Sequence, residues 1–501
     1  MTHSRCRGRL RSQDLQDGDI IIREPGEGPS RLRLLEANSA SVFVRQLGLN
    51  INPAHAPPLS CYAWNLGLNK EVAYFPRPQV GILHILNAAQ MRTMAAEYFS
   101  HVAPVYNFLG QEYVESEIGR RWLEQSLSDP VDAMLCGVAA LGSLFSGGLP
   151  NVIEAQLVQA ARGALECSTS LPSPCIDHVV GWLLRVIYLR ATASPQATWM
   201  ACCTLMHMIE TTKLHLEPSD HWILAQSAKD CPSELRRRIY WVAQLFNTWV
   251  SSDCGKSEVE LRGASSEFPS SSWTKDQLQL CRISYLLGQT LDFGPAEIDA
   301  EMSALCALSP REAMLQLLQC NIGLCFFRRL RALGRHMADA SLEALLDLAE
   351  SSLAVVDELL NVSCPWWHVI NIPFQIVCTL LVIDTIRSLG LLGEALDVLK
   401  RVVGRYSTAT AQETYEIACF LVTQERQRRS KRLEHLTTAV DGHSPSAAEP
   451  TPIAEIDVGY TPDVSASLID QGLDLNSPLV DYFFFGHPFP QDEQLVGDWG
   501  Q

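Results

Sequence analysis

The chain has 501 residues, of which 47% are hydrophobic, and its formal net charge is −17 at pH 7. This length leaves room for a large hydrophobic core and for more than one region. The excess of acidic groups excludes a protein that binds nucleic acid through a generally basic surface.

The beginning of the chain shows no regular pattern. We expect residues 1–75 to form an irregular N-terminal segment, because the basic start is typical of a solvated terminus and proline-rich stretches follow it. Regular helical patterns begin near Val80.

Apolar residues recur at three- and four-residue steps through most of residues 76–432, which predicts helices. We find no convincing alternation typical of strands. The predicted fold is therefore all-α, a large and irregular multi-helix domain. In its first half, helices are expected at Pro130–Phe145, Ile176–Arg190 and Pro195–Leu216, with Pro150 in the first turn of another helix.

The stretch from Ser233 to Gly255 has the strongest helical pattern. Ser233 is a candidate N-cap, since its hydroxyl can accept a hydrogen bond from a free amide of the first turn. The apolar surface extends around Trp241 and beyond one stripe, so this helix belongs inside a larger core. Gly255 is a suitable end, because glycine adopts left-handed backbone angles without strain.

The second half repeats this organisation after a serine-rich loop, Ser257–Ser272. Pro373 is expected to break or start a helix within Pro365–Leu389. Helices are predicted at Thr274–Leu291, Ser309–His336, Ser341–Asn361, Ala395–Tyr406 and Thr408–Gln424.

A basic run follows the last of these helices. Five cations within seven residues are typical of a nuclear import signal, and equally of a solvated helix end whose charges favour the helix dipole. These residues are Arg426, Arg428, Arg429, Lys431 and Arg432.

Residues 433–501 are predicted to be a disordered tail that is acidic and aromatic. Residues 441–501 hold eleven Asp or Glu and no Lys or Arg. Interleaved acidic and apolar residues are typical of activation segments that bind a coactivator. Tyr482, Phe483, Phe484 and Phe485 would make that contact. Two alternatives are a plain linker-like tail and a tail that docks back on the helical core.

Sequence motifs of common enzymes are absent from the chain, among them G-x-S-x-G, G-x-x-x-x-G-K-[ST], H-E-x-x-H and G-x-G-x-x-G. We therefore expect no enzyme activity and no catalytic residue. Sixteen cysteines contain no C-x-x-C pair, so we expect free thiols packed as small apolar groups, no metal site and no cofactor.

Three segments together resemble the fungal-specific transcription factor domain, the middle-homology region of regulators that usually carry an N-terminal binuclear zinc cluster. Tyr98–Phe108 resembles the opening of that domain, with Asn107 in place of its second proline, and Pro365–Leu389 resembles a later segment. In the central helix, family counterparts are matched by Arg236, Arg237, Arg238, Tyr240, Trp241, Ser251 and Gly255.

The resemblance covers about residues 80–430, and two departures lie in the central helix. Asn247 and Thr248 stand where the family usually has Asp-Arg, and Lys256 and Ser257 stand where Arg-Pro is usual. These changes put in doubt any ion pair or ligand contact that the Asp-Arg pair makes in the family.

The resemblance implies a transcriptional regulator in a fungal nucleus, with secondary-metabolite genes as a candidate pathway. A binuclear zinc cluster needs six thiolates, and Cys6 is the one cysteine among the first sixty residues. Either this protein lacks the cluster or the gene model has lost an exon. We expect contact with DNA only indirectly, through a DNA-binding factor or a homo- or heterodimer partner, and no contact with a membrane. The alternative is an all-α enzyme or small-molecule binder with a deep polar pocket.

Overall fold

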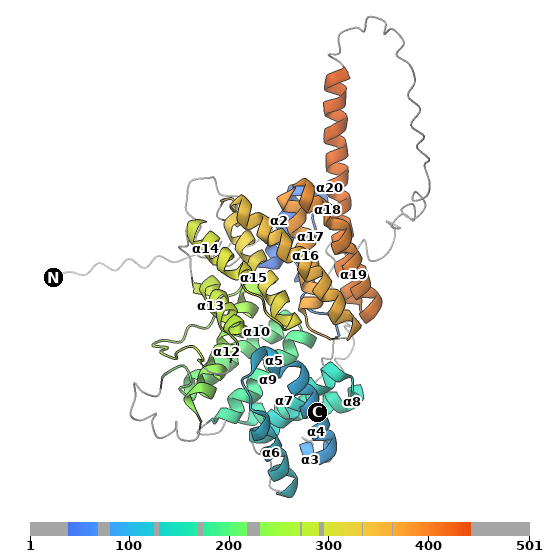
Figure 1. The fold of residues 1–501 in the computed structure, drawn as a ribbon. Coiled ribbons are helices and arrows are strands. Elements are labelled where there is room, and N and C mark those ends of the chain that lie inside the picture. The colour runs from blue at the N-terminus through green and yellow to red at the C-terminus, as the bar shows by residue number, and fades with distance from the viewer. Residues whose placement is uncertain are drawn as a thin grey trace, which may run out of the picture.

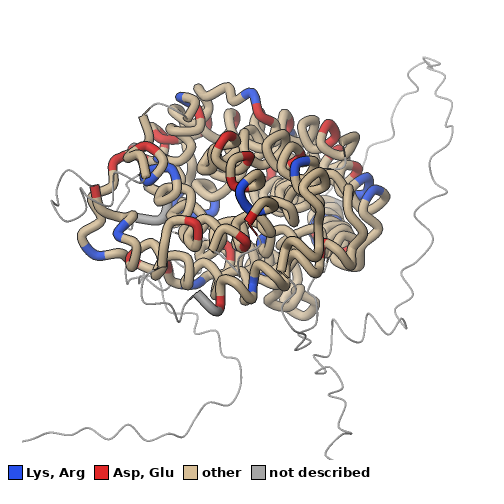
Figure 2. The backbone as a smooth tube through the Cα atoms, turned by 90° about the horizontal axis from the view of Figure 1, so that it is seen from below, with Lys and Arg blue, Asp and Glu red and all other residues tan. Residues whose placement is uncertain are grey.

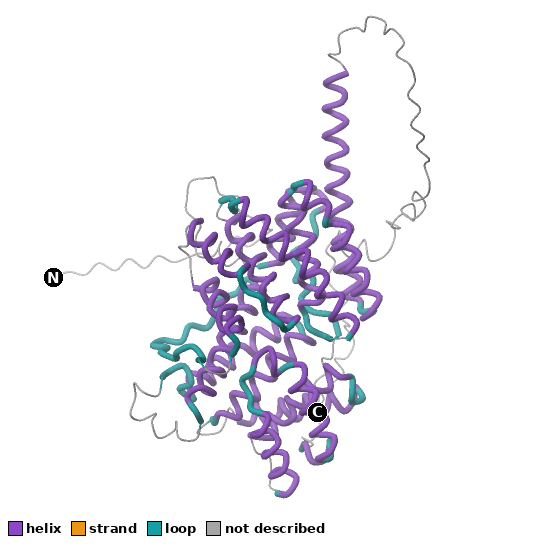
Figure 3. The backbone as a smooth tube through the Cα atoms, in the orientation of Figure 1, coloured by secondary structure: helices purple, strands orange, loops and turns teal. Residues whose placement is uncertain are grey.

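The structure is a computed structural model that describes residues 39–68, 81–124, 130–168, 174–217, 231–270, 273–289, 295–332, 334–362 and 364–441. Every regular element in these ranges is a helix, as Figure 3 shows, and none is a strand. The predicted all-α fold is confirmed.

The helices of the first half follow one another with short connections. They are α2 (Ala40–Ile51), η1 (Pro53–His55), α3 (Ile82–Ile85), α4 (Ala88–His101), α5 (Ala103–Tyr106), α6 (Gln111–Leu123), α7 (Pro130–Ser146), α8 (Asn151–Ser168), α9 (Ile176–Thr192), α10 (Pro195–Thr211) and α12 (Ser233–Cys254). The predictions near Pro130, Ile176, Pro195 and Ser233 all correspond to helices.

The second half is built in the same way. Its helices are α13 (Lys275–Gln289), α14 (Pro295–Cys306), α15 (Ala313–Ala332), α16 (Asp339–Asn361), α17 (His368–Ile383), α18 (Ile386–Gly390), α19 (Leu392–Tyr406) and α20 (Ala409–Asp441). Figure 1 shows α3–α9 at one end of the molecule and α14–α20 at the other, with α10, α12 and α13 between them.

One helix is central to each half, and almost every residue of both central helices is buried. Helix α7 packs against α4, α8 and α9, and α17 packs against α15, α16, α19 and α20. A helix that is apolar on most of its surface is stable only when other helices enclose it. Gly142 lets α7 approach α4 closely, since a Cβ at this position would lie 2.0 Å from the Met94 carbonyl oxygen.

The expectation that Pro373 breaks or starts a helix is wrong. Pro373 lies inside α17, five residues after its first residue, His368. Proline removes one backbone hydrogen bond and crowds the preceding turn. All residues from His368 to Leu381 are buried, so packing outweighs this local cost.

Helix α2 lies within the segment that was expected to be irregular. Its buried residues Phe43, Val44, Leu47 and Ile51 have the spacing of one helical face. The helix contacts α12, α17 and α20, so residues from the start of the chain pack beside its last helix (Figure 1). This spacing is the signal that would have identified α2 from the sequence.

Helix α20 extends beyond the expected domain boundary at residue 432 and ends at Asp441. Figure 1 shows its last turns projecting away from the other helices. The remainder of the predicted tail, residues 442–501, lies outside the described residues. Within the described ranges, no helix combines the length and apolar character needed to cross a membrane.

Candidate functional site: the arginine row of helix α12

Helix α12 begins and ends at defined backbone positions. Pro232, not Ser233, is the N-cap, and its carbonyl accepts the amide of Arg236 at 3.1 Å. Ser233 is therefore the first helical residue, which corrects the predicted cap by one position. Gly255 ends the helix with φ of +63°, and its amide donates to the carbonyls of Ser251 and Ser252. The predicted end is confirmed.

Arg236 is buried against the turn that follows α10. Its Nη2 donates to the carbonyl oxygen of Lys213 at 2.8 Å. Lys213 has a left-handed backbone with φ of +58°, and its carbonyl belongs to the end of the preceding helix. Burial lowers the pKa of the Arg236 guanidinium. This arginine therefore fixes a turn and is enclosed by protein.

Arg237 forms a two-pronged ion pair. Its Nε and Nη2 donate to the two carboxylate oxygens of Glu217 at 3.1 and 2.9 Å, and Nη2 also donates to Glu267 at 2.6 Å. The hydrogen bond with Glu217 raises the pKa of Arg237. Paired N–H donors match a carboxylate in geometry as well as charge. Arg237 thus connects the end of the turn after α10 to the loop after α12.

Arg238 points to the third neighbouring segment, the end of α5. Its Nη1 donates to the Asn107 carbonyl at 2.6 Å and to the Asn107 side-chain oxygen at 3.1 Å. Asn107 is the C-cap of α5 and has φ of +45°, a left-handed conformation that asparagine tolerates and proline cannot adopt. The replacement of the family's second proline by Asn107 therefore provides an arginine acceptor.

The three arginines together hold three segments against one helix turn. Their partners come from residues 213–217, from Glu267 and from Asn107. Each guanidinium makes intramolecular hydrogen bonds. The row is thus an internal clamp, in which Arg237 pairs with carboxylates and the other two arginines donate to neutral oxygen atoms.

An aromatic cluster lies one turn further along α12. Trp241 is 5% exposed, stacks on Phe268 with ring centroids 3.9 Å apart, and meets Tyr285 edge-on at 5.1 Å. Its indole Nε1 donates to the Glu267 carbonyl at 2.8 Å. Tyr240 is buried beside it. The loop after α12 is therefore held by both stacking and hydrogen bonds.

Asn247 and Thr248, which stand where the family usually has Asp-Arg, form hydrogen bonds to the loop after α12. Asn247 donates from Nδ2 to the Val259 carbonyl at 3.0 Å and accepts the Val259 amide at 3.1 Å. Thr248 donates to the Glu258 carboxylate at 2.9 Å. Burial raises the pKa of Glu258. Asn247 thus satisfies both backbone groups of one loop residue, which keeps the loop in place without a charged pair.

Ser251 and Lys256 complete the helix end. Ser251 is buried, and its carbonyl accepts the amides of Gly255 and Lys256. Lys256 lies at the surface, where its ammonium group is 4.3 Å from the centre of the Trp199 ring. The matched residues of α12 therefore share one role, which is to join segments of the domain.

Sequence reasoning missed a buried arginine in the centre of the molecule, Arg190. Arg190 of α9 is 2% exposed and donates from Nη2 to Asp253 of α12 at 3.0 Å. It also donates to the Trp64 carbonyl and lies 3.7 Å from the centre of the Trp64 ring. Asn65 donates to the Ala193 carbonyl at 2.9 Å. The sequence gives no local signal for this junction, because its members are far apart in the chain.

The segment around Trp64 connects the two halves. We call residues 61–68 the strap. Asn371 of α17 donates to the Ala63 carbonyl at 3.2 Å, and Thr408 donates to the Leu66 carbonyl at 2.5 Å. Trp64 and Asn65 donate hydrogen bonds to the Ala193 carbonyl at the end of α9. The strap is therefore a buried, irregular segment bound by both halves of the domain.

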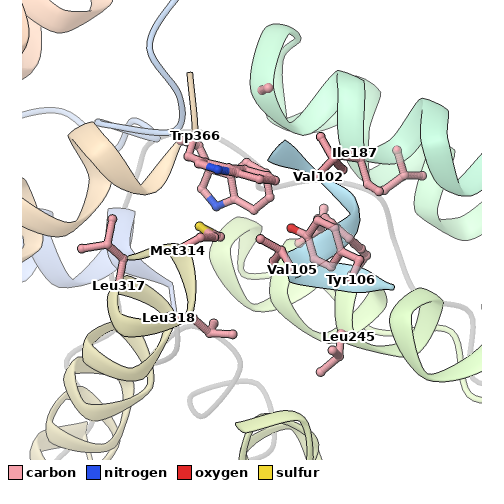
Figure 4. Packing of buried hydrophobic residues seen from close by; sticks show 14 of the residues in the cluster. Val102, Val105, Tyr106, Ile187, Leu245, Met314, Leu317, Leu318 and Trp366 are labelled. Atoms are coloured by element: carbon pink, nitrogen blue, oxygen red, sulfur yellow. The ribbon is translucent and has the colours of Figure 1, made fainter. Parts of the chain in front are cut away.

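The apolar centre is closely filled. Figure 4 shows Val105, Tyr106, Leu245, Met314 and Leu318 converging where both halves meet. The cavity among these residues has a volume of about 20 Å³, whereas small-molecule sites measure about 300–1,000 Å³. A larger hollow of about 540 Å³ is open to solvent and is bridged by the Arg401–Asp357 ion pair. The filled centre does not favour the small-molecule alternative.

The aromatic turn before α17 belongs to the packed core, and the residue that ends α17 lies nearer the surface. Trp366 and Trp367 are buried with ring centroids 5.6 Å apart, and His368 is buried beside them. Asp384 ends α17 and pairs with Arg429. In the described part of the chain, no group of three or more His, Cys, Asp or Glu side chains is placed to hold a metal ion.

The basic run lies on α20, and its members differ in exposure. Arg428 and Arg429 are half-buried and bind the Glu425 carboxylate, at 2.7 and 2.8 Å respectively. Arg426, Lys431 and Arg432 are exposed. Tyr482, Phe483, Phe484 and Phe485 lie outside the described residues.

The described residues form an all-helical domain with an internal arginine clamp on α12 and a closely filled apolar centre. The profile described as "Fungal specific transcription factor domain" matches residues 95–269. The chain belongs to this family of fungal transcription factors, and it is a transcriptional regulator.

Curated relatives agree with this assignment. The chain is 33% identical to Protein RDR1 of Gibberella zeae, over 82% of this chain and 76% of the relative. It is 33% identical to Transcription factor kojR of Aspergillus oryzae, over 83% and 75% of the two chains, and 29% identical to Protein RDR1 of Saccharomyces cerevisiae, over 88% and 81%. No solved structure matches the chain significantly.

Proposed function

We propose that this regulator is a nuclear, non-enzymatic protein that reaches DNA through a DNA-binding partner. The observation that carries the proposal is the use of Arg236, Arg237 and Arg238 inside the domain. Phosphate contacts require exposed cations, and these three guanidiniums are engaged by protein acceptors.

The charge distribution supports the same proposal. Figure 2 shows Lys and Arg positions scattered among Asp and Glu positions over the described backbone. Affinity for DNA comes largely from phosphate contacts with clustered cations. Together with the net charge of −17, this supports a partner that supplies base recognition.

The test is a gel-shift titration of the full chain with genomic promoter fragments at physiological salt. We expect binding that is weak and has no sequence preference, and sequence-selective binding only when a partner factor is added. Nanomolar, sequence-selective binding by the chain alone would contradict the proposal.

We further propose that residues 441–501 activate transcription by binding a coactivator. Eleven acidic residues keep the interleaved aromatic groups solvated until an apolar groove accepts them. Fusion of 441–501 to an unrelated DNA-binding domain should activate a reporter, and changing Phe483, Phe484 and Phe485 to alanine should abolish most of the signal. Equal signals from the two fusions would disprove this role.

The target genes that we propose are those of a secondary-metabolite cluster, on the family resemblance alone. Transcript profiling of a strain that lacks this gene is the direct test. Loss of transcripts confined to one co-located gene set is expected. A profile with no co-located set would refute the assignment.

A further inference from the structure

The end of α20 presents a stripe of mixed character, which the functions above do not use. Leu433, Leu436 and Val440 are 65%, 65% and 66% exposed. Arg426 and Arg429 precede them, and all five follow each other at steps of three and four residues. On a helix this spacing places them along one side. We call these five residues the α20 stripe.

The stripe is basic near the body of the protein and apolar toward the helix end. Arg429 is bound by Glu425 and Asp384, which fixes that end of the stripe against the domain. The outer turns project from the other helices (Figure 1). Leu433 and Leu436 are therefore large apolar side chains that the described residues do not cover.

We propose that the α20 stripe binds the acidic, aromatic part of this chain's own residues 442–501. Of the eleven acidic residues in 441–501, ten follow Asp441, and no Lys or Arg accompanies them. Asp481 directly precedes Tyr482–Phe485. The acidic residues of such a segment can pair with the cationic part of the stripe, and its aromatic residues can pack on the apolar part.

The distances are compatible with an intramolecular contact. Val440 and Arg426 are 14 residues apart, which corresponds to about 21 Å along a helix. About 40 residues join Asp441 to Tyr482, and a random-coil chain of this length would have an r.m.s. span of about 35 Å. A tether of this length gives the tail an effective concentration at the stripe on the order of a millimolar. The chain's own tail is therefore favoured over the tail of a separate molecule.

A second copy of α20 fits the stripe less well. Two parallel helices in register would place Arg426 and Arg429 beside their copies, and like charges at such an interface destabilise it. The apolar part is also short, with three residues. The acidic tail would compensate the charge of Arg426, whereas a second copy would bring a like charge beside it.

This contact deepens the proposed function, because it would cover Arg426 and Arg429 of the basic run and the activation aromatics at the same time. The inference rests on the proposed import and activation roles for its consequence, but its physical test is independent of both. Binding by the tail would make these two cations and the aromatic groups less accessible together. An import receptor or a coactivator that competes for its part of the contact would expose the cations and the aromatic groups together.

Trypsin provides the test, since it cleaves after Lys and Arg and the tail contains neither. Limited digestion of the full chain releases an intact C-terminal fragment when α20 is cut between Arg426 and Arg432, and mass spectrometry measures its rate of appearance. Changing Leu433, Leu436 and Val440 to glutamine keeps helix propensity and should accelerate this cleavage at least about fivefold.

Two further variants make the test specific. Changing Phe483, Phe484 and Phe485 to serine leaves α20 untouched and should accelerate the same cleavage equally. The combined variant should be no faster than either alone, since both changes remove one contact. A matched control on the other side of the helix, Glu434, His435 and Thr438 to glutamine, should cleave at the original rate.

Each other outcome overturns the inference. Equal rates for all variants would mean that no contact protects α20. Acceleration by the helix variant alone would indicate a different occupant, and protection that rises with protein concentration would indicate a second copy. If the reporter fusion is inactive while the full chain still protects α20 from trypsin, the activation role is removed and the contact stands. If the fusion is active while the full chain shows no such protection, the contact is removed and the activation role stands.

Discussion

At the scale of single residues, the residues of α12 that match the family motif act through hydrogen bonds and packing, and not through charge alone. Arg238 reaches Asn107 across 131 positions of sequence, and Trp241 reaches the loop at Glu267. Each interaction joins α12 to a segment that carries no strong structural signal of its own. A large part of the stability of the loops should therefore depend on this helix.

Trp241 offers the clearest stability prediction. Trp241→Asp should unfold the middle of the domain, because an unpaired carboxylate would replace a buried ring that stacks on Phe268. Loss of a large buried aromatic costs about 3–5 kcal/mol before the charge is counted. Thermal unfolding measures the effect. Trp241→Phe is the control and should lose about 1 kcal/mol, mainly the indole hydrogen bond. A soluble Trp241→Asp variant with an unchanged Tm would show that Trp241 is not part of the core.

His368 predicts a pH dependence of stability. Burial, and then the nearby Arg190, hold the pKa of His368 well below its usual 6.5. The unfolded chain therefore binds a proton below pH 6.5 that the folded protein excludes, so stability falls as the pH falls. Wild type should lose about 1.4 kcal/mol more than His368→Gln between pH 7.5 and 5.5.

The measurement is chemical denaturation at several pH values. His207→Gln, at an exposed histidine, is the matched control and should keep the wild-type slope. Parallel pH profiles of wild type and His368→Gln would refute the assignment.

At the scale of elements, α20 combines a packed beginning with a projecting end. The helix contacts α2, α17 and α19, and the exposed members of the basic run lie before its projecting last turns. The helix continues because its residues favour helix and contain neither Gly nor Pro before Asp441. An accessible basic segment on a fixed base is a suitable form for an import signal.

Nuclear import should depend on the exposed cations. Changing Arg426, Arg428, Arg429, Lys431 and Arg432 to alanine should leave the protein in the cytoplasm, and changing Arg426, Lys431 and Arg432 alone should produce most of this effect. Arg428 and Arg429 are engaged by Glu425, so their double alanine variant should retain more nuclear protein. Imaging of fluorescent fusions is the measurement. An unchanged nuclear signal in the five-residue variant would eliminate the import role.

At the scale of the whole molecule, the strap makes the two halves one unit. Residues near the start of the chain bind the end of α9 on one side and α17 and Thr408 on the other. Arg190 and Asp253 close this junction from the first half. The halves should therefore unfold together.

Arg190→Met tests that cooperativity. It removes a guanidinium that is 2% exposed and leaves Asp253 without this partner, which should cost about 3–5 kcal/mol. Denaturation followed by circular dichroism and by tryptophan fluorescence should give coincident curves for wild type. The control is Arg401→Ala in the exposed Arg401–Asp357 pair, for which about 1 kcal/mol or less is expected. An Arg190→Met variant as stable as the control would mean that the junction contributes little.

The sequence by itself determined the all-α class, most helix positions in residues 130–424 and the family. Helices such as α12 follow from local apolar spacing and a terminal glycine, and both are readable within one stretch of chain. The three family segments are likewise local motifs. Local energetics and motif spacing need no knowledge of distant residues.

Only the tertiary structure decided what the chemically distinctive side chains do. It placed Arg236, Arg237 and Arg238 on internal acceptors, kept Pro373 within a helix and buried the strap beside Arg190. These outcomes depend on partners that are distant in sequence, such as Asn107 for Arg238. Spacing along a chain fixes which face a side chain occupies, but its partner is set by which segments pack against that face.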